Sequence, residues 1–317
     1  MVAFITHRLL QTVIVLILLS FIAFSILHLI PGDPVVTMLG IEATQAQIEK
    51  VRHELGLDRP ILVQYLRWFG NMLQGDFGRS IMYRESVAAL ILTRLPVTFH
   101  IGFIALILST LISIPAGVIS AVKRGTFLDQ LITVSANIGL AVPVFWLGII
   151  GIYFFALKLG WLPVQGYSSL FDNFWLNTRQ IIMPVICLAV LPLASLTRQA
   201  RSSMLEVIRQ DYIRTARSKG LKERVVIMEH GLKNAVIPVI TLLGLQLRNL
   251  VGGSVLVETV FNIPGMGRLL VTGVFDKDFV VVQGCVMVVA IVVALANLAV
   301  DISYGYFDPR IRVQEQD

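Results

Sequence analysis

Residues 9–30, LLQTVIVLILLSFIAFSILHLI, form an apolar run long enough to decide the fold class. A helix needs about 20 consecutive apolar residues to cross the hydrocarbon core of a bilayer. His7 and Arg8 precede the run, as the basic region of a signal peptide would, but no small-x-small cleavage motif follows it. The run therefore predicts a retained transmembrane helix.

The composition of the whole chain agrees with a membrane protein. The chain has 317 residues, of which 56% are hydrophobic and 15% charged, and its mean hydropathy is +0.79. A soluble domain with this balance would expose large apolar patches. The two cysteines, Cys187 and Cys285, both lie in apolar runs, so we interpret them as packing residues.

Runs of spanning length occur at 9–30, 97–122, 131–157, 181–197, 236–257 and 282–304. They predict an all-α, polytopic integral membrane protein with six transmembrane helices. The fourth run is short and contains Pro184 and Pro192, so we expect a kinked or tilted helix there. Two further helices are predicted between the spans, an amphipathic one at 60–74 and a short one at 267–275.

Charge predicts the orientation of these spans. The connection 198–235 carries nine Lys and Arg against four Asp and Glu, whereas the long connection 31–96 is balanced at seven each. Because cytoplasmic loops carry an excess of Lys and Arg, we expect 198–235, the short turn 123–130 and both termini in the cytoplasm. The segment 31–96 is then external.

Chemistry-bearing motifs are largely missing from the sequence. It has no Gly-x-x-x-x-Gly-Lys-Ser/Thr phosphate loop, no His/Cys/carboxylate grouping with metal-ligand spacing and no nucleophile–base constellation. We therefore expect no catalytic residue, no metal site and no cofactor in this chain.

One intramembrane charge is a candidate for function. Arg248 lies near the middle of the fifth span, where an arginine costs roughly 2.5–3.5 kcal/mol on insertion scales. We expect it to line a water-filled path, or to pair with a carbonyl or a partner subunit. Gly252, Gly253 and Ser254 permit close helix approach nearby. The candidate pathway residues are Arg248, Asn249, Ser254 and Glu258.

The stretch DYIRTARSKGLKER, residues 211–224, indicates a shaped cytoplasmic segment. Leu205, Ile208, Tyr212 and Ala216 share one helical stripe, which predicts that the fourth span continues below the membrane. Gly220 is placed as a helix C-cap, and residues 222–238 predict a second helix that returns to the fifth span. Such a hairpin suits anionic lipid or a groove on a soluble partner, and spacing alone leaves both open. Nucleic-acid binding is disfavoured because aromatic residues are scarce.

Several stretches in chain order resemble permease subunits of ABC-type importers, in the dipeptide, oligopeptide and nickel branch. They are PGDP (31–34), LGLDRP (55–60), GDFGRS (75–80), RLPVT (94–98), AVPVFWLGI (141–149), DYIRTARSKGL (211–221), HGLKNAVIPV (230–239), GGSVLVETVFNIPGMGRLL (252–270), VVQG (281–284) and DPRIR (308–312). The resemblance implies a type I importer permease, a MetI-like bundle, that translocates di- or oligopeptides across a bacterial cytoplasmic membrane.

The resemblance also implies a role for the hairpin, as the coupling helix that docks on an ATP-hydrolysing subunit. Its residues are Asp211, Tyr212, Arg214, Thr215, Ala216, Ser218, Lys219, Gly220 and Leu221. The general importer signature begins Glu-Ala-Ala-x-x-x-Gly, and here Arg214 replaces the glutamate while Ala216 and Gly220 match. The implied partners are a second, similar permease, two ATP-binding subunits that hold ATP and Mg, and an external substrate-binding protein.

The expected organisation has three parts. Residues 1–96 form the first span and the external segment, 97–304 a five-helix core that includes the coupling loop 198–235, and 305–317 a cytoplasmic tail. Alternatives for the function are uptake of a nickel–metallophore complex or glutathione by the same family, or a stand-alone secondary transporter. An adjacent second permease gene and two ATPase genes would discriminate against the last.

Overall fold

The computed structural model describes residues 2–29, 35, 44–54 and 58–307. The stretches PGDP at 31–34 and DPRIR at 308–312, and with them most of the predicted tail, lie outside the described residues. In the described part the regular elements are helices, together with one isolated β-bridge between Arg79 and Ser86. The chain divides into two compact units, and the boundary between Val97 and Thr98 falls inside a helix.

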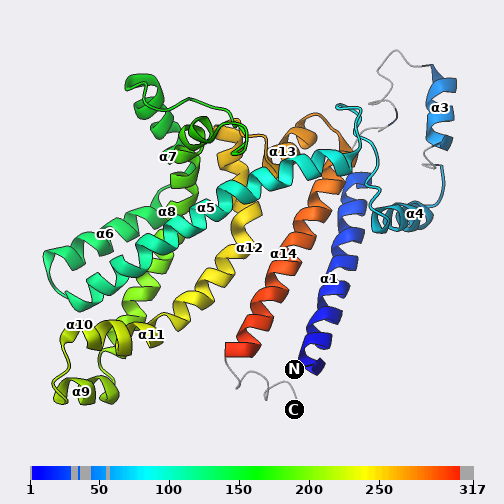
Figure 1. The fold of residues 1–317 in the computed structure, drawn as a ribbon. Coiled ribbons are helices and arrows are strands. Elements are labelled where there is room, and N and C mark those ends of the chain that lie inside the picture. Colours follow the sequence, from blue (N-terminus) through cyan, green and yellow to red (C-terminus); the bar gives the residue numbers. More distant parts are fainter. Residues whose placement is uncertain (1, 30–34, 36–43, 55–57, 308–317) are drawn as a thin grey trace. The chain divides into compact units, whose positions relative to one another are not determined.

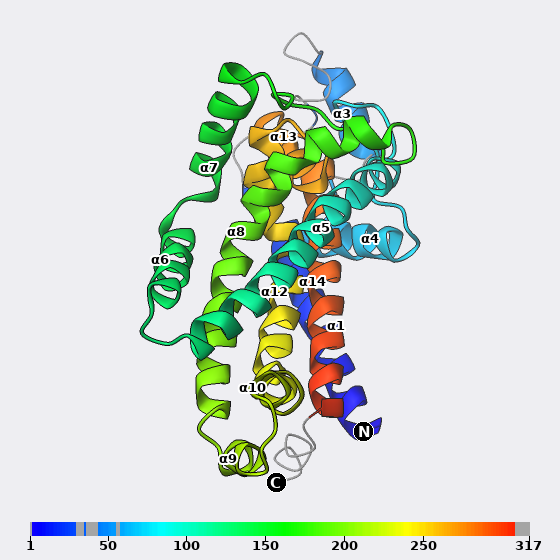
Figure 2. The same ribbon diagram turned by 60° about the vertical axis from the view of Figure 1, so that its left-hand side comes forward.

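Unit 1 comprises Met1–Val97 and Pro264–Asp317. Its helices are α1 (Val2–Leu29), α3 (Gln45–Glu54), α4 (Ile61–Leu73), the start of α5 (Val87–Val122), α13 (Met266–Phe275) and α14 (Phe279–Phe307). The long helices α1 and α14 pack side by side (Figures 1 and 2). The predicted amphipathic helix at 60–74 is α4, and the predicted short helix at 267–275 is α13.

The apolar stripe of α4 packs on α1. Tyr65 and Met72 are buried, and the Tyr65 hydroxyl lies 2.8 Å from the buried Ser20 Oγ of α1. Phe24 packs edge-on against the same tyrosine ring. Ile61, the first residue of the helix, is 56% exposed.

Unit 2 comprises Thr98–Ile263 and holds the remaining helices. They are the rest of α5, α6 (Phe127–Ala141), α7 (Val144–Gly151), the π-helix η1 (Ile152–Lys158), α8 (Phe174–Val207), α9 (Asp211–Ser218), α10 (Glu223–Val225), the π-helix η2 (Val226–Gly231), α11 (Leu232–Ala235) and α12 (Ile237–Val260). Helix α8 packs against α6, α7 and α12 (Figure 2), so it is the centre of this unit.

Four helices are continuous, long and apolar enough to cross a membrane, and two bent helix pairs raise the number to six if each pair is one span. Six spans agree with the sequence. Two boundaries were too short: the run 97–122 lies in a helix that begins at Val87, and the run 181–197 lies in α8. The apolar run marks only the part of a helix that suits lipid, whereas helical hydrogen bonding continues through the flanking polar turns.

The third span was predicted as one run, 131–157, and the structure corrects this. Helices α6 and α7 meet at a bend of 100°. Val142 takes an extended backbone conformation before Pro143, as expected because a proline ring disfavours the helical conformation of the residue before it. A hydropathy profile carries no information about this backbone constraint. The presence of Pro143 in the sequence does indicate it.

Candidate functional site

Helix α9 is a short helix, separate from α8, at the tip of the connection between α8 and α12 (Figure 1). Gln210 precedes it with an extended backbone, φ −71° and ψ 150°, and Asp211 in the first turn complements the positive end of the helix dipole. Gly220, with φ +76°, follows its end, and the Gly220 N–H donates to the Arg217 carbonyl at 2.9 Å. The predicted glycine C-cap is thus present.

The predicted continuous stripe through Leu205, Ile208, Tyr212 and Ala216 was wrong. Helix α8 ends at Val207 and the extended residue Gln210 separates it from α9. The helical phase is therefore reset, and Tyr212 lies on the exposed side, 42% exposed. The continuation of the fourth span beyond the membrane-length run is confirmed as far as Val207.

The inner face of α9 is apolar and anchored. Ile213 and Ala216, three residues apart, are 1% and 6% exposed and form a cluster with the buried Val226 of η2. Val207, at the end of α8, packs against the same cluster. The position of α9 is therefore fixed by packing against both arms of the hairpin.

The outer face of α9 is polar and accessible. Of the nine residues predicted to dock a partner, Ala216 is buried and the other eight are exposed: Asp211, Tyr212, Arg214, Thr215, Ser218, Lys219, Gly220 and Leu221. The Tyr212 hydroxyl accepts a hydrogen bond from Asn234 Nδ2 at 2.9 Å, which orients its ring. The helix thus offers a rigid, mixed polar and apolar surface.

An ion pair closes the turn after α9. Arg217 Nη2 lies 2.6 Å from Glu223 Oε1, and Arg217 Nε lies 3.1 Å from Glu223 Oε2. This hydrogen bond raises the pKa of Arg217 above its ordinary value, so the guanidinium is charged at any physiological pH.

At the base of the hairpin that carries α9, the two arms pack together around Met204. This side chain is fully buried and forms a cluster with Ala121 of α5 and Ala235 of α11. A Cβ on Gly231 would lie 2.8 Å from Met204 Cε, so the glycine lets η2 approach the end of this side chain closely. The base of the hairpin is therefore continuous with the helix bundle of unit 2.

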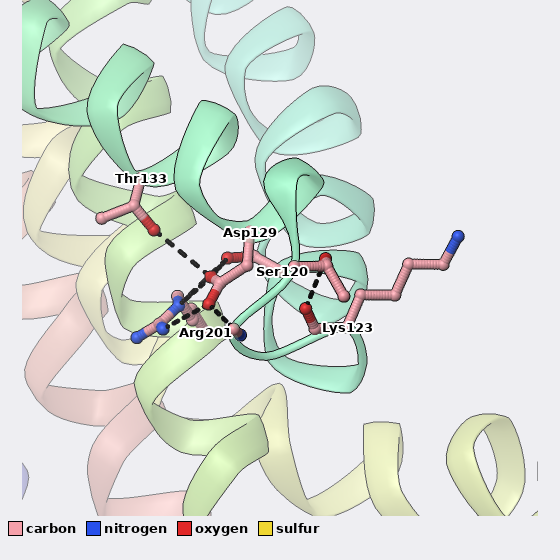
Figure 3. A network of polar contacts seen from close by, with 7 residues as sticks. Ser120, Lys123, Asp129, Thr133 and Arg201 are labelled. Atoms are coloured by element: carbon pink, nitrogen blue, oxygen red, sulfur yellow. Dashed lines mark hydrogen bonds and ion pairs between the residues drawn. The ribbon is translucent and has the colours of Figure 1, made fainter.

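A charged network lies at the turn between α5 and α6 (Figure 3). Arg201 of α8 donates from Nε to Asp129 Oδ1 at 2.8 Å and from Nη2 to Asp129 Oδ2 at 3.0 Å. Ser120 Oγ donates to Oδ1 at 2.5 Å, and the Gly125 N–H donates to Oδ2 at 3.0 Å. Asp129 is 5% exposed, so the carboxylate joins α5, the turn and α8 within the protein.

Sequence reasoning missed this network. Arg201 was counted only in the positive charge of 198–235, and it lies 72 residues from Asp129 in the sequence. The signal in the sequence is an aspartate in the otherwise uncharged, mostly apolar stretch FLDQLITV (127–134), because a buried carboxylate needs a partner.

The predicted pathway residues are all on α12. Arg248 and Asn249 lie within this helix, but their side chains are outside the described part of the structure. Ser254 and Glu258 are fully buried. Glu258 Oε1 accepts hydrogen bonds from Thr98 Oγ1 at 2.6 Å and from Ser254 Oγ at 2.8 Å, so the carboxylate ties α12 to α5.

The described residues contain no group of three or more His, Cys, Asp or Glu side chains placed to hold a metal ion. Both cysteines are buried and free.

Two family models match the chain. The model of the binding-protein-dependent transport system inner membrane component matches residues 113–313, and the N-terminal model of the same membrane component matches residues 1–102. Together they account for most of the sequence.

Curated relatives match over nearly the full length. The oligopeptide transport system permease protein AppB of Bacillus subtilis (strain 168) is 43% identical, over 98% of this chain and 99% of the relative. The dipeptide transport system permease protein DppB of Alkalihalophilus pseudofirmus is 39% identical, over 98% and 100%. The di/tripeptide transport system permease protein DppB of Pseudomonas aeruginosa is 39% identical, over 99% and 100%.

Two solved structures share the fold. An amino acid ABC transporter chain aligns with a TM-score of 0.53 at 13% identity, covering 69% of this chain and 94% of that chain. A chain of the MetNI methionine ABC transporter, in inward-facing conformations, aligns with a TM-score of 0.50 at 20% identity, covering 67% and 94%. The expected MetI-like bundle is confirmed.

Proposed function

Because the chain belongs to the family of binding-protein-dependent transport system inner membrane components, we propose that it is the membrane-spanning permease subunit of an ABC importer for di- and oligopeptides. The substrate class is taken from the relatives, which are named as peptide permeases and are 38–43% identical. Such a permease works with ATP-binding and substrate-binding components.

The observation that carries this proposal is the construction of α9. Its inner face is buried through Ile213 and Ala216, its outer face is exposed, and its turn is closed by an ion pair. A solvated loop needs none of these features. A helix that must transmit force to the bundle needs all three, because a flexible docking segment would absorb the movement of its partner.

In the proposed mechanism an ATP-binding subunit binds the exposed residues between Asp211 and Leu221, which belong to α9 and to the turn after it. Closure of those subunits on ATP and Mg moves α9, and α8 carries the movement into the spans. The access of the pathway then switches between the two sides of the membrane, since ATP binds more tightly to one of the two states. This chain holds neither ATP nor Mg and is not an enzyme.

The proposed assembly contains a second, homologous permease, two ATP-binding subunits and an extracytoplasmic substrate-binding protein. We place the chain in the bacterial cytoplasmic membrane with both termini in the cytoplasm. The connection 198–235 has nine Lys and Arg but four Asp and Glu, and this positive balance supports the orientation.

Within the assembly, α12 forms a wall of the translocation pathway. We assign Arg248 and Asn249 to its lining, where an arginine can meet a peptide carboxylate. Ser254 and Glu258 hold that wall through the hydrogen bond from Thr98.

The test is reconstitution of the chain with its genomic-neighbour permease, ATPases and binding protein in vesicles. We expect uptake of labelled di- and oligopeptides that requires ATP hydrolysis and the binding protein. Uptake driven by an ion gradient without ATP would identify a secondary transporter. Uptake of a nickel complex or glutathione in place of peptides would retain the importer and overturn the substrate class.

A further inference from the structure

We propose that Asp129 and Arg201 are a positioning pair. The pair makes the α5–α6 turn and the C-terminal end of α8 move as one body with α9. This inference rests on the proposed function, in which α9 receives the movement of an ATP-binding subunit. The pair joins α8 to α6 next to the α5–α6 turn (Figure 3). It thereby determines how much of that movement reaches α5 and α6.

The geometry of the pair resists both sliding and rotation. Arg201 contacts both oxygens of Asp129, at 2.8 and 3.0 Å, and a bidentate guanidinium–carboxylate contact fixes orientation as well as distance. Ser120 and the Gly125 N–H hold the same carboxylate from α5 and from the turn. The Asp129 carboxylate of α6 is therefore bonded to α5, to the turn and to α8 at the same time, so none of these elements moves away without breaking a contact.

Close packing attaches α5 and α6 to α8 at two further points. A Cβ on Gly117 of α5 would lie 2.5 Å from Ala200 Cβ and 2.7 Å from the Thr197 carbonyl oxygen. A Cβ on Gly139 of α6 would lie 3.2 Å from a methyl group of Val190. With the ion pair as a third attachment, α5 and α6 cannot hinge on α8 about a single contact.

A packed route leads from this region to α9. Met204, one turn beyond Arg201, is clustered with Ala121. Val207 packs against this cluster and also against the cluster of Ile213 and Ala216 in α9. Displacement of α9 is thus transmitted through side chains that are already in contact.

A contiguous route demonstrates coupling only when breaking it changes the movement at the far end. The first experiment therefore measures movement directly. Spin labels are placed at Lys123→Cys, in the α5–α6 turn, and at Lys222→Cys, beyond α9, because both lysines are exposed. The native Cys187 and Cys285 are buried and leave the introduced sites as the accessible ones.

The label-to-label distance is measured by pulsed electron resonance in the complete complex in nanodiscs, with and without a non-hydrolysable ATP analogue. We expect one narrow distribution that is the same in both states. Asp129→Asn should broaden the distribution or shift it on nucleotide binding. An Asp129→Asn distribution equal to that of the parent, or a parent distance that changes with nucleotide, overturns the proposal.

Matched variants separate positioning from general damage to the fold. Arg198, one turn before Arg201, is exposed, so Arg198→Gln should leave the distribution unchanged and Arg201→Gln should broaden it. If Asp129→Asn fails to assemble, Arg201→Lys replaces it, because lysine keeps the charge without the bidentate fork. A narrow, nucleotide-independent distance in Arg201→Lys overturns the proposal equally.

A second readout is the amount of peptide carried per ATP hydrolysed. We expect this ratio to fall several-fold in Asp129→Asn and in Arg201→Gln while ATP hydrolysis is retained. The double variant should show no more than the loss of the worse single variant, since the two residues act as a unit; additive losses overturn the pairing. If the parent complex carries no peptide, the proposed function fails, while the distance measurement still tests the pair.

Discussion

Arg217 and Glu223 close the turn after α9 with two parallel contacts, 2.6 Å between Nη2 and Oε1 and 3.1 Å between Nε and Oε2. Between them lies Gly220, with φ +76°. The ion pair joins the two ends of the turn, and the left-handed conformation of Gly220 sets the direction of the backbone between them. The shape that α9 offers to a partner therefore depends on both.

Gly220→Val should uncouple transport from ATP hydrolysis. Nothing lies within 4 Å of a Cβ at this position, so the effect is conformational: a β-branched residue at positive φ costs about 1–3 kcal/mol. The turn should change its path and move Lys219 and Leu221. In reconstituted complexes we expect ATP hydrolysis without proportionate peptide uptake.

The control for this prediction is Gly220→Asn, because asparagine tolerates the left-handed conformation. It should retain most of the uptake per ATP. Normal substrate-stimulated hydrolysis and normal uptake in Gly220→Val would remove the turn from the coupling mechanism.

Arg217→Lys should affect coupling more than stability. The Arg217 and Glu223 side chains are 39% and 54% exposed, and a pair this exposed contributes about 0–1 kcal/mol to the free energy of unfolding. Lysine keeps the charge but loses the fork that holds Glu223. We expect an unchanged thermal midpoint in detergent together with reduced uptake per ATP, and a large fall in the midpoint would contradict this division of roles.

Ile213→Ala should loosen α9 from the hairpin. Ile213 is 1% exposed, and such a truncation costs roughly 2–5 kcal/mol, against about 0.5–1.5 kcal/mol for Ile213→Val. Hydrogen–deuterium exchange of residues 211–218 should accelerate in the alanine variant and change little in the valine variant. Equal protection in the two variants would show that α9 is held by something other than this cluster.

The span pattern was predictable because hydrophobic length is recorded directly in the sequence. The six runs, the amphipathic helix over 60–74 and the glycine after α9 all follow from local periodicity or local backbone preference. Pro143, which bends the third span by 100°, also had a local signal, but hydropathy outweighed it.

The interior of the site could not be predicted in the same way. Gln210 carries no strong breaker signal, yet its extended backbone resets the helical phase and places Ile213 rather than Tyr212 on the buried face. Asp129 and Arg201 are far apart in sequence and meet only because α6 packs on α8. Such pairings depend on tertiary packing, which periodicity does not record.

Glu258→Ala should destabilise the permease. Thr98 and Ser254 donate to Glu258 Oε1 at 2.6 and 2.8 Å, and removing one partner of a buried hydrogen bond costs about 1–3 kcal/mol. Less folded protein should be recovered from membranes, with a lower thermal midpoint. Glu258→Gln keeps an acceptor oxygen and should be near the parent. Normal stability with altered peptide affinity in the alanine variant would instead place the carboxylate on the pathway.

Arg248→Ala should reduce peptide uptake without reducing the amount of chain in the membrane. Removing an arginine from the middle of a span favours insertion by roughly 2.5–3.5 kcal/mol, so poor insertion cannot explain a loss of uptake. Arg248→Lys should retain part of the activity, because a cation remains on the path. Gln246→Ala, two residues earlier on α12, is the control for a change of side-chain polarity alone. Unchanged uptake of every peptide by Arg248→Ala would show that its charge serves the assembly and not the substrate.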